Sequence, residues 1–217
     1  MIFNTHYPFI GGGGGGVPQF TYTGQYNFID DGSGNWRIKF LTSGVLTYTK
    51  DVIVDVFLVG AGGGGKSGST ARAGGGGGYT KTVKSVTITK KTRYPIEIGV
   101  SGESVDGGNS SAFGVTADGG KLGGTTLFNG GDGGSGGGAF KATGGVDGAN
   151  GNSLSPYIGG KGQGTTTREF GESTGDLYAS GGSGVSNGAT AGANNTGDGG
   201  DIGKAGGSGI VVIRNAR

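Results

Sequence analysis

The stretch that decides the fold is Val52-Ile53-Val54-Asp55-Val56-Phe57-Leu58-Val59, which runs directly into Gly60-Ala61-Gly62-Gly63-Gly64-Gly65. Its first half is a short run that is apolar on both faces, which predicts a central β-strand covered on both sides. Its second half has almost no side chains that could pack. The chain therefore joins a conventional β core to glycine-rich backbone within one continuous segment.

The surrounding segments predict further strands. Apolar residues alternate with polar ones over 20–28, where Phe20, Tyr22, Tyr26 and Phe28 share one face, and again over 36–40 and 94–100. Strands are also predicted at 45–49, 79–89 and 210–213, the last being apolar on both faces. Apolar positions at helical spacing never continue for ten residues without a glycine, so we expect very little helix.

Glycine dominates the second half of the chain. Of the 217 residues, 59 are glycine, about four times the usual share of about 7%. Some of these glycines recur every third residue, as in Gly130, Gly133 and Gly136, and again from Gly197 to Gly209. A period of three is that of the polyproline II helix, whose backbone groups point sideways and can bond to neighbouring helices where glycine permits close approach.

Two interpretations of residues 119–209 remain open at this point. The first is a disordered glycine/serine linker, because these residues have few side chains that could form a core. The apolar strand 210–213 that follows favours packed glycine helices instead, because a linker seldom ends in a strand of the preceding domain. The predicted fold class is all-β, an antiparallel β region packed with a sandwich of polyglycine II helices.

This interpretation divides the chain into four parts. Residues 1–19 form a flexible or attachment segment, 20–118 a β-rich region, 119–209 a polyglycine-rich region, and 210–217 a closing strand. The 1–19 segment has neither the basic start nor the long apolar run of a secretory signal, so we expect none.

Composition argues against several classes of protein. The net charge is only +2 and the cations are scattered, with Lys90, Lys91 and Arg93 as the one cluster, so no nucleic-acid partner is expected. There is no cysteine for disulfides or a cysteine zinc site. The apolar run 52–59 is too short to cross a membrane, so no membrane insertion is expected.

The segment Gly60–Ser67 matches the phosphate-binding pattern G-x-x-x-x-G-K-S and follows a predicted strand. That motif requires a helix immediately afterwards, whose N-terminus holds the phosphate. Here five consecutive glycines, Gly74–Gly78, follow within a few residues and predict no helix. We therefore interpret the match as a product of glycine content and expect no nucleotide cofactor.

Other residues that suggest chemistry form no complete site. The acidic pairs Asp198/Asp201 and Asp132/Asp147 lack the repeated spacing of calcium-binding nonapeptides and are interpreted as loop carboxylates. His6 is the only histidine, which argues against a catalytic triad or a histidine metal site. We predict no catalytic residue, no metal and no enzymatic activity.

The ordered set of segments resembles a known family, the glycine-rich domain of bacteriophage tail fibre and tail tip proteins. The resemblance rests on the 54–65 stretch and on Gly74–Val83, followed by the segments at 36–44, 107–114, 160–172 and 206–214. It covers about residues 20–217. Relatives have a richer Gly/Ala tract where this chain has Gly99–Ser104, so the local packing there is expected to differ.

The resemblance implies a polyglycine II sandwich at the end of a tail fibre, with loops at its tip that recognise a receptor on the host surface. The leading hypothesis is a non-catalytic adhesin that binds a protein or glycan receptor and other phage tail proteins. A homotrimer is one of the assembly states that the resemblance leaves open. The alternative is a structural virion component of the tail or head. Either would be made in the bacterial cytoplasm without a signal peptide and released within the virion.

Recognition requires side chains, so the candidate receptor residues are the larger ones that interrupt the glycines. They are Leu154, Tyr157, Ile158, Arg168, Phe170, Leu177 and Tyr178. Aromatic and arginine side chains carry much of the energy of binding when they fill pockets. The alternative is that these residues hold neighbouring glycine helices together or fill a small second core.

Overall fold

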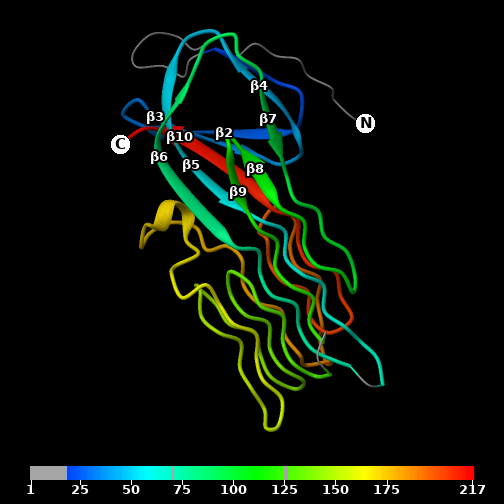
Figure 1. Cartoon of the computed structure of the whole chain (residues 1–217). Helices are drawn as coiled ribbons and strands as arrows, with labels where there is room; N and C mark the ends of the chain where they lie inside the picture. The colour runs from blue at the N-terminus through cyan, green and yellow to red at the C-terminus, as the bar shows by residue number, and fades with distance from the viewer. Residues whose placement is uncertain (1–18, 70, 125–126) are drawn as a thin grey trace.

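The computed structural model describes residues 19–69, 71–124 and 127–217 and confirms the all-β prediction (Figure 1). Two antiparallel sheets of five strands each make up the regular structure. Sheet A has the order β1 (Phe20–Tyr22), β4 (Gly44–Tyr48), β7 (Tyr94–Glu97), β8 (Ser110–Ala112), β9 (Val115–Ala117). Sheet B has the order β2 (Tyr26–Gly32), β3 (Asn35–Phe40), β10 (Ile210–Asn215), β5 (Val52–Val59), β6 (Thr80–Ile88). The described residues contain no α-helix, only the three-residue 3₁₀ turn η1 (Glu169–Gly171).

The main core lies between the two sheets. Sheet A contributes Phe20, Leu46, Tyr48 and Ile96, and sheet B contributes the inward residues of β3, β5 and β10, among them Ile38 and Phe40. Alternation along each strand places these side chains on one face. The aromatic and branched residues of the first half of the chain therefore form a conventional β-sandwich.

The closing strand β10 lies in the middle of sheet B, between β3 and β5. Ile210 pairs with Val59 and Asn215 with Val54, antiparallel to β5. Both faces of β10 from Ile210 to Arg214 and of β5 from Val54 to Val59 are covered, as the apolar runs predicted. The end of the chain thus returns through the glycine-rich stretch to the centre of the first sheet.

The alternating run 20–28 is not one strand, which corrects the prediction. It divides into β1 in sheet A and β2 in sheet B, with a break at residues 23–25. Gly24 is packed so closely against Ser43 and Thr42 that a Cβ there would collide with their carbonyl oxygens. The chain crosses between the sheets at this glycine, so continuous alternation did not mean a continuous strand.

The strand predicted at 94–100 is also shorter than expected and ends at Glu97. The hairpin of β8 and β9 was not predicted. Its two turn residues, Phe113 and Gly114, have φ values of 52° and 75°, as tight two-residue hairpins require. Strands of three residues carry too little periodicity to be recognised in the sequence.

Outside the strands, the described residues of three segments form what we call the glycine region: 60–69 with 71–79, 98–109, and 118–124 with 127–209. They run alongside one another below the sheets in Figure 1. The first two segments lie in the part assigned to the β-rich region, so glycine packing begins earlier in the chain than residue 119. Residues 1–18 of the predicted attachment segment lie outside the described residues.

Hydrogen bonds in the glycine region follow a period of three. From Gly60 to Gly65, successive N–H groups donate to three neighbours in rotation: Tyr79, Gly108 and Gly207, then Gly76, Val105 and Lys204. From Gly74 to Tyr79, the acceptors are Gly138, Gly200 and Lys121, then Ser135, Gly197 and Asp118. Each of these two runs therefore bonds to three neighbouring runs rather than to itself.

The runs are close enough to exclude side chains. A Cβ added at Gly60, Gly62, Gly63 or Gly65 would come far closer than 3.0 Å to a backbone carbonyl oxygen of another run. Ala139 and Ala142, which continue the row from Gly130, are both buried. The glycine region is thus a packed part of the molecule, with backbone against backbone.

Candidate functional site

The first three candidate residues lie in one turn at the end of the glycine region. Leu154 and Tyr157 exchange backbone hydrogen bonds of 3.1 and 2.8 Å and so close the turn around Ser155 and Pro156. In Figure 1 this turn lies at the end of the molecule away from the two sheets. Ile158 follows, and its N–H donates to Asn129 Oδ1 at 2.8 Å.

An aromatic cluster supports this turn. The ring centroid of Tyr157 lies 4.7 Å from that of Phe128 and 6.3 Å from that of Phe140, and the two phenylalanines are 5.3 Å apart. Backbone hydrogen bonds hold the cluster, because Phe140 N–H donates to Phe128 and Gly130 N–H donates to Ile158. All three rings are half-buried.

Aliphatic side chains extend this cluster into solvent. Leu127 is 63% exposed, Ile158 62% and Leu154 46%. Lys141 Nζ lies 5.3 Å from the centroid of Phe140 and is the nearby cation. We call the set Leu127, Phe128, Phe140, Leu154, Tyr157 and Ile158 the apolar tip. Exposed apolar groups gathered in one place are typical of surfaces that bind another molecule.

Sequence reasoning missed half of the apolar tip. Leu127, Phe128 and Phe140 were not candidates, although they flank the glycine run 130–138 at its two ends. Phe128 and Phe140 meet because the chain bends back at residues 133–135, so that Gly137 N–H donates to Gly131 and Phe140 N–H to Phe128.

The second group of candidates lies elsewhere, on the outer face of sheet B. Phe170 is 6% exposed and Tyr178 5% exposed. Their rings lie 5.8 and 5.4 Å from that of Phe57, and they form a second core with Val59, Ala179, Ile210 and Val212. Phe170 and Tyr178 therefore offer little surface to a partner.

A buried carboxylate secures this second core. Glu169 is 2% exposed and lies 2.6 Å from Arg37 and 3.1 Å from Lys39, while Tyr178 O–H donates to it at 3.0 Å. Burial raises the pKa of Tyr178 to about 12, so its hydroxyl keeps its proton at neutral pH. The arrangement fixes the η1 segment to β3.

A second ion pair lies beside it in sheet B. Asp55, the polar residue within the apolar run 52–59, pairs with Arg214 at 3.2 Å, and both are buried. Arg214 also pairs with Glu172 at 2.8 Å and lies 4.0 Å from the Phe170 ring centroid. Arg214 and Glu172 also line a polar pocket of about 230 Å³, and because they pair with each other they offer little free charge to a ligand.

Arg168 and Leu177 face each other across an isolated bridge. Arg168 is half-buried, donates to the Gly175 carbonyl at 3.1 Å and lies 3.4 Å from Asp147. Leu177 is 39% exposed. The seven candidate residues therefore form two separate groups, and Leu154, Tyr157 and Ile158 are the group that lies in the apolar tip, where Leu154 and Ile158 are exposed.

The phosphate-binding motif is engaged in packing. All six N–H groups from Gly60 to Gly65 donate to backbone carbonyls at 2.8 to 3.0 Å. No helix follows within the described residues 66–69 and 71–79; instead Lys66 pairs with Ala73 in a bridge. The backbone groups that would hold a phosphate are thus already bonded.

The acidic pairs accept backbone hydrogen bonds. Asp201 accepts from Ser183 and Thr190, Asp198 from Ser180, and Asp132 from Lys161. Across the described residues, no three acidic or histidine side chains gather in a way that could hold a metal ion. These carboxylates therefore act as local acceptors that hold loops in place.

Comparison with known proteins gives one family match. A family model described as a glycine-rich domain matches residues 41–216. The chain belongs to this glycine-rich domain family. The matched range extends from just before β4 to the end of β10, and it contains the whole glycine region. No curated protein matches the chain, and no helix among the described residues is long and apolar enough to span a membrane.

Proposed function

We propose that this glycine-rich domain is a non-catalytic, receptor-binding module of a bacteriophage tail, which recognises the surface of a bacterial host through the apolar tip. The observation that carries the proposal is the apolar tip itself. Leu127, Leu154 and Ile158 are exposed there on a base of three aromatic rings. Other tail proteins would be its partners in the virion, and the host receptor its partner after release.

The glycine region suits this role as a support. Its backbone hydrogen bonds rotate among three neighbours with a period of three, and on this pattern we propose that its runs are polyglycine II helices. A support built from backbone leaves the connecting turns free to vary, and loops on fixed supports commonly carry recognition.

The proposal is tested by binding of fluorescently labelled protein to a panel of bacterial strains. The tip variant Leu154→Ser/Ile158→Thr removes two exposed apolar side chains. We expect it to lose at least about tenfold in binding to the strain that binds best, since side chains central to an interface contribute about 2 kcal/mol or more each. Its melting temperature should stay near that of the parent because both residues are exposed.

Ile53→Thr is the matched control. Ile53 is also exposed, at 53%, but it lies on β5 at the opposite end of the molecule. Binding should be unchanged in this variant. Equal loss in both variants would contradict recognition at the tip. Absence of binding to every strain would favour the alternative, a structural component of the virion.

A further inference from the structure

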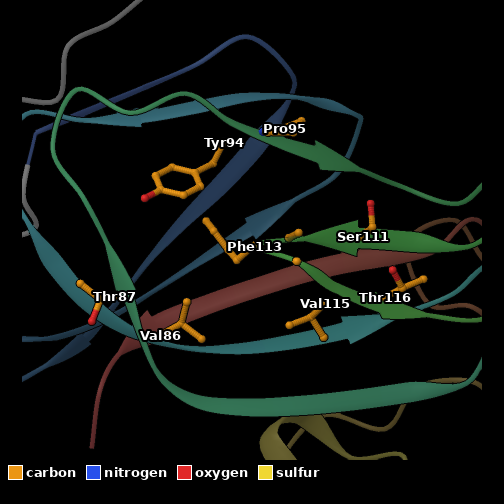
Figure 2. A pocket seen from close by; sticks show the side chains of 10 residues that line it. Val86, Thr87, Tyr94, Pro95, Ser111, Phe113, Val115 and Thr116 are labelled. Atoms are coloured by element: carbon orange, nitrogen blue, oxygen red, sulfur yellow. The ribbon is translucent and has the colours of Figure 1, made fainter.

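A groove opens at one side of the β-sandwich, between the edge strands β9 of sheet A and β6 of sheet B. It has a volume of about 400 Å³. Figure 2 shows Tyr94 and Phe113 on the sheet A side and Val86 on β6, with Val115 between the sheets. We call this the side groove. It gives access to the main core, against which these four side chains pack.

The side groove is lined by apolar side chains and by uncharged hydroxyl side chains. Tyr94 and Phe113 lie with ring centroids 5.4 Å apart, and none of the ten lining residues is ionised at neutral pH. Its volume is within the range of pockets that take small ligands, and it lies beside strand edges, which can accept an added extended segment. The side groove therefore fits an uncharged, extended peptide with bulky apolar side chains.

The chain itself contains such a segment. Residues 1–10 include Ile2, Phe3, Phe9 and Ile10 and no Asp, Glu, Lys or Arg. Six glycines, Gly11–Gly16, separate them from the first strand. We propose that residues 1–10 bind in the side groove of the same chain, with Gly11–Gly16 as the tether.

The tether is long enough. Gln19 accepts hydrogen bonds from Thr49 beside β1, and β1 is four strands from β9 in sheet A. Neighbouring strands are about 4.8 Å apart, so the distance across the sheet is roughly 19 Å. The eight residues 11–18 can span up to about 26 Å when extended.

Cysteine cross-linking tests the proposal directly, because the chain has no cysteine of its own. Phe9→Cys is combined with Thr116→Cys, which places one thiol in the segment and one at an exposed position on β9 in the groove lining. Under mild oxidation we expect a disulfide within one chain, seen by mass and by mobility on a non-reducing gel. It should form at least about tenfold faster than in the control, because docking holds residue 9 beside position 116, whereas the tether alone raises the local concentration equally in both variants.

The control combines Phe9→Cys with Asn27→Cys. Asn27 is exposed on β2, the edge strand at the other side of sheet B, so its thiol is equally accessible but outside the groove. Equal rates in the two variants would overturn the proposal. Cross-linking only between chains would also overturn it, in favour of a second copy as the occupant.

A second measurement uses Thr116→Cys by itself, which avoids any disulfide. Its alkylation should be slowed several-fold in the full chain and should recover when residues 1–10 are deleted. It should recover equally in Phe3→Ser/Phe9→Ser, which keeps the length of the segment. Unchanged alkylation after deletion would show that the segment does not cover the groove.

Discussion

Gly76 shows how much depends on a missing methyl group. A Cβ at this position would collide with the carbonyl oxygen of Asp132. We therefore expect Gly76→Ala to lower the free energy of unfolding by about 1–3 kcal/mol or more, as overpacked sites do. Gly68→Ala is the control, because its nearest neighbour would be the Ala71 oxygen at 3.5 Å. Chemical denaturation measures both, and equal stability in the two variants would argue against tight glycine packing.

Glu169 provides a second test at a single residue. Glu169→Gln removes the buried charge that pairs with Arg37 and Lys39. Both cations are partly exposed, so we expect a loss of about 1–3 kcal/mol, below the range for fully buried pairs. Asp106→Asn removes an exposed partner of Lys121 and should cost about 1 kcal/mol or less. A smaller loss for Glu169→Gln than for Asp106→Asn, measured in urea, would contradict this account.

Single residues also show where sequence reasoning reached its limit. Tyr157 and Tyr178 occur in similar glycine-rich surroundings, yet Tyr157 lies in the exposed tip and Tyr178 is buried against Phe57. Tyr178 is buried because its segment of the glycine region packs against sheet B, and that contact joins residues far apart in the sequence. No local pattern encodes it, so the sequence could identify the candidates but could not separate the two groups.

Among the elements, the run Gly60–Gly65 matches a phosphate-binding motif in sequence, but its backbone hydrogen bonds are those of a packed structural segment. Its N–H groups are all bonded to neighbouring runs. We expect no saturable binding of ATP or GTP at millimolar concentration by isothermal titration calorimetry. A binding signal that disappears in Lys66→Ala would show that the motif is functional after all.

The segment from η1 to Tyr178 should respond to acid. Its attachment uses Asp176, whose pKa is held below the usual value by the hydrogen bond from Lys39 and by the charge of Lys39. Burial raises the pKa of Asp31, but Arg37 and Arg217 outweigh this effect and lower it overall. Groups with a lowered folded pKa stabilise the protein above their unfolded pKa of about 3.9, and this contribution is lost as the pH falls through the folded value.

The melting temperature should therefore be nearly constant down to about pH 5 and fall below about pH 4. Asp176→Asn should be less stable at neutral pH and should show a shallower fall in acid. Scanning calorimetry between pH 7 and pH 2.5 measures both. An acid slope identical to that of the parent protein would mean that Asp176 does not contribute to the pH dependence.

Strands were the best-predicted elements, and the reasons are local. β5 and β10 are apolar on both faces and β3 alternates cleanly, so pattern and burial agree. The split between β1 and β2 and the short hairpin of β8 and β9 depend on close approach at Gly24 and on three-residue strands. Neither the split nor the hairpin produces a periodic sequence pattern long enough to recognise.

At the scale of the whole molecule, the two ends differ in chemistry. Both described ends of the chain lie at the sandwich end, where Gln19 pairs with Thr49 and Ala216 N–H donates to Ile53. The apolar tip lies at the other end, across the glycine region. A module that is joined at one end and binds at the other needs an intervening part that does not bend, so the order of the glycine region is the property on which the proposed function depends.

Limited proteolysis tests that order. Trypsin can cleave after Lys141, Lys161 and Lys204, which are exposed within the glycine region, but cleavage requires local opening of the backbone. Since neighbouring runs bond to one another in rotation, opening one run breaks contacts with three others. We therefore expect residues 119–209 to resist trypsin under native conditions and to be cleaved rapidly in Gly76→Ala or in denaturant. Early accumulation of a stable fragment ending near residue 118 would instead mean that the region behaves as a linker and could not hold the tip at a fixed distance from the sandwich.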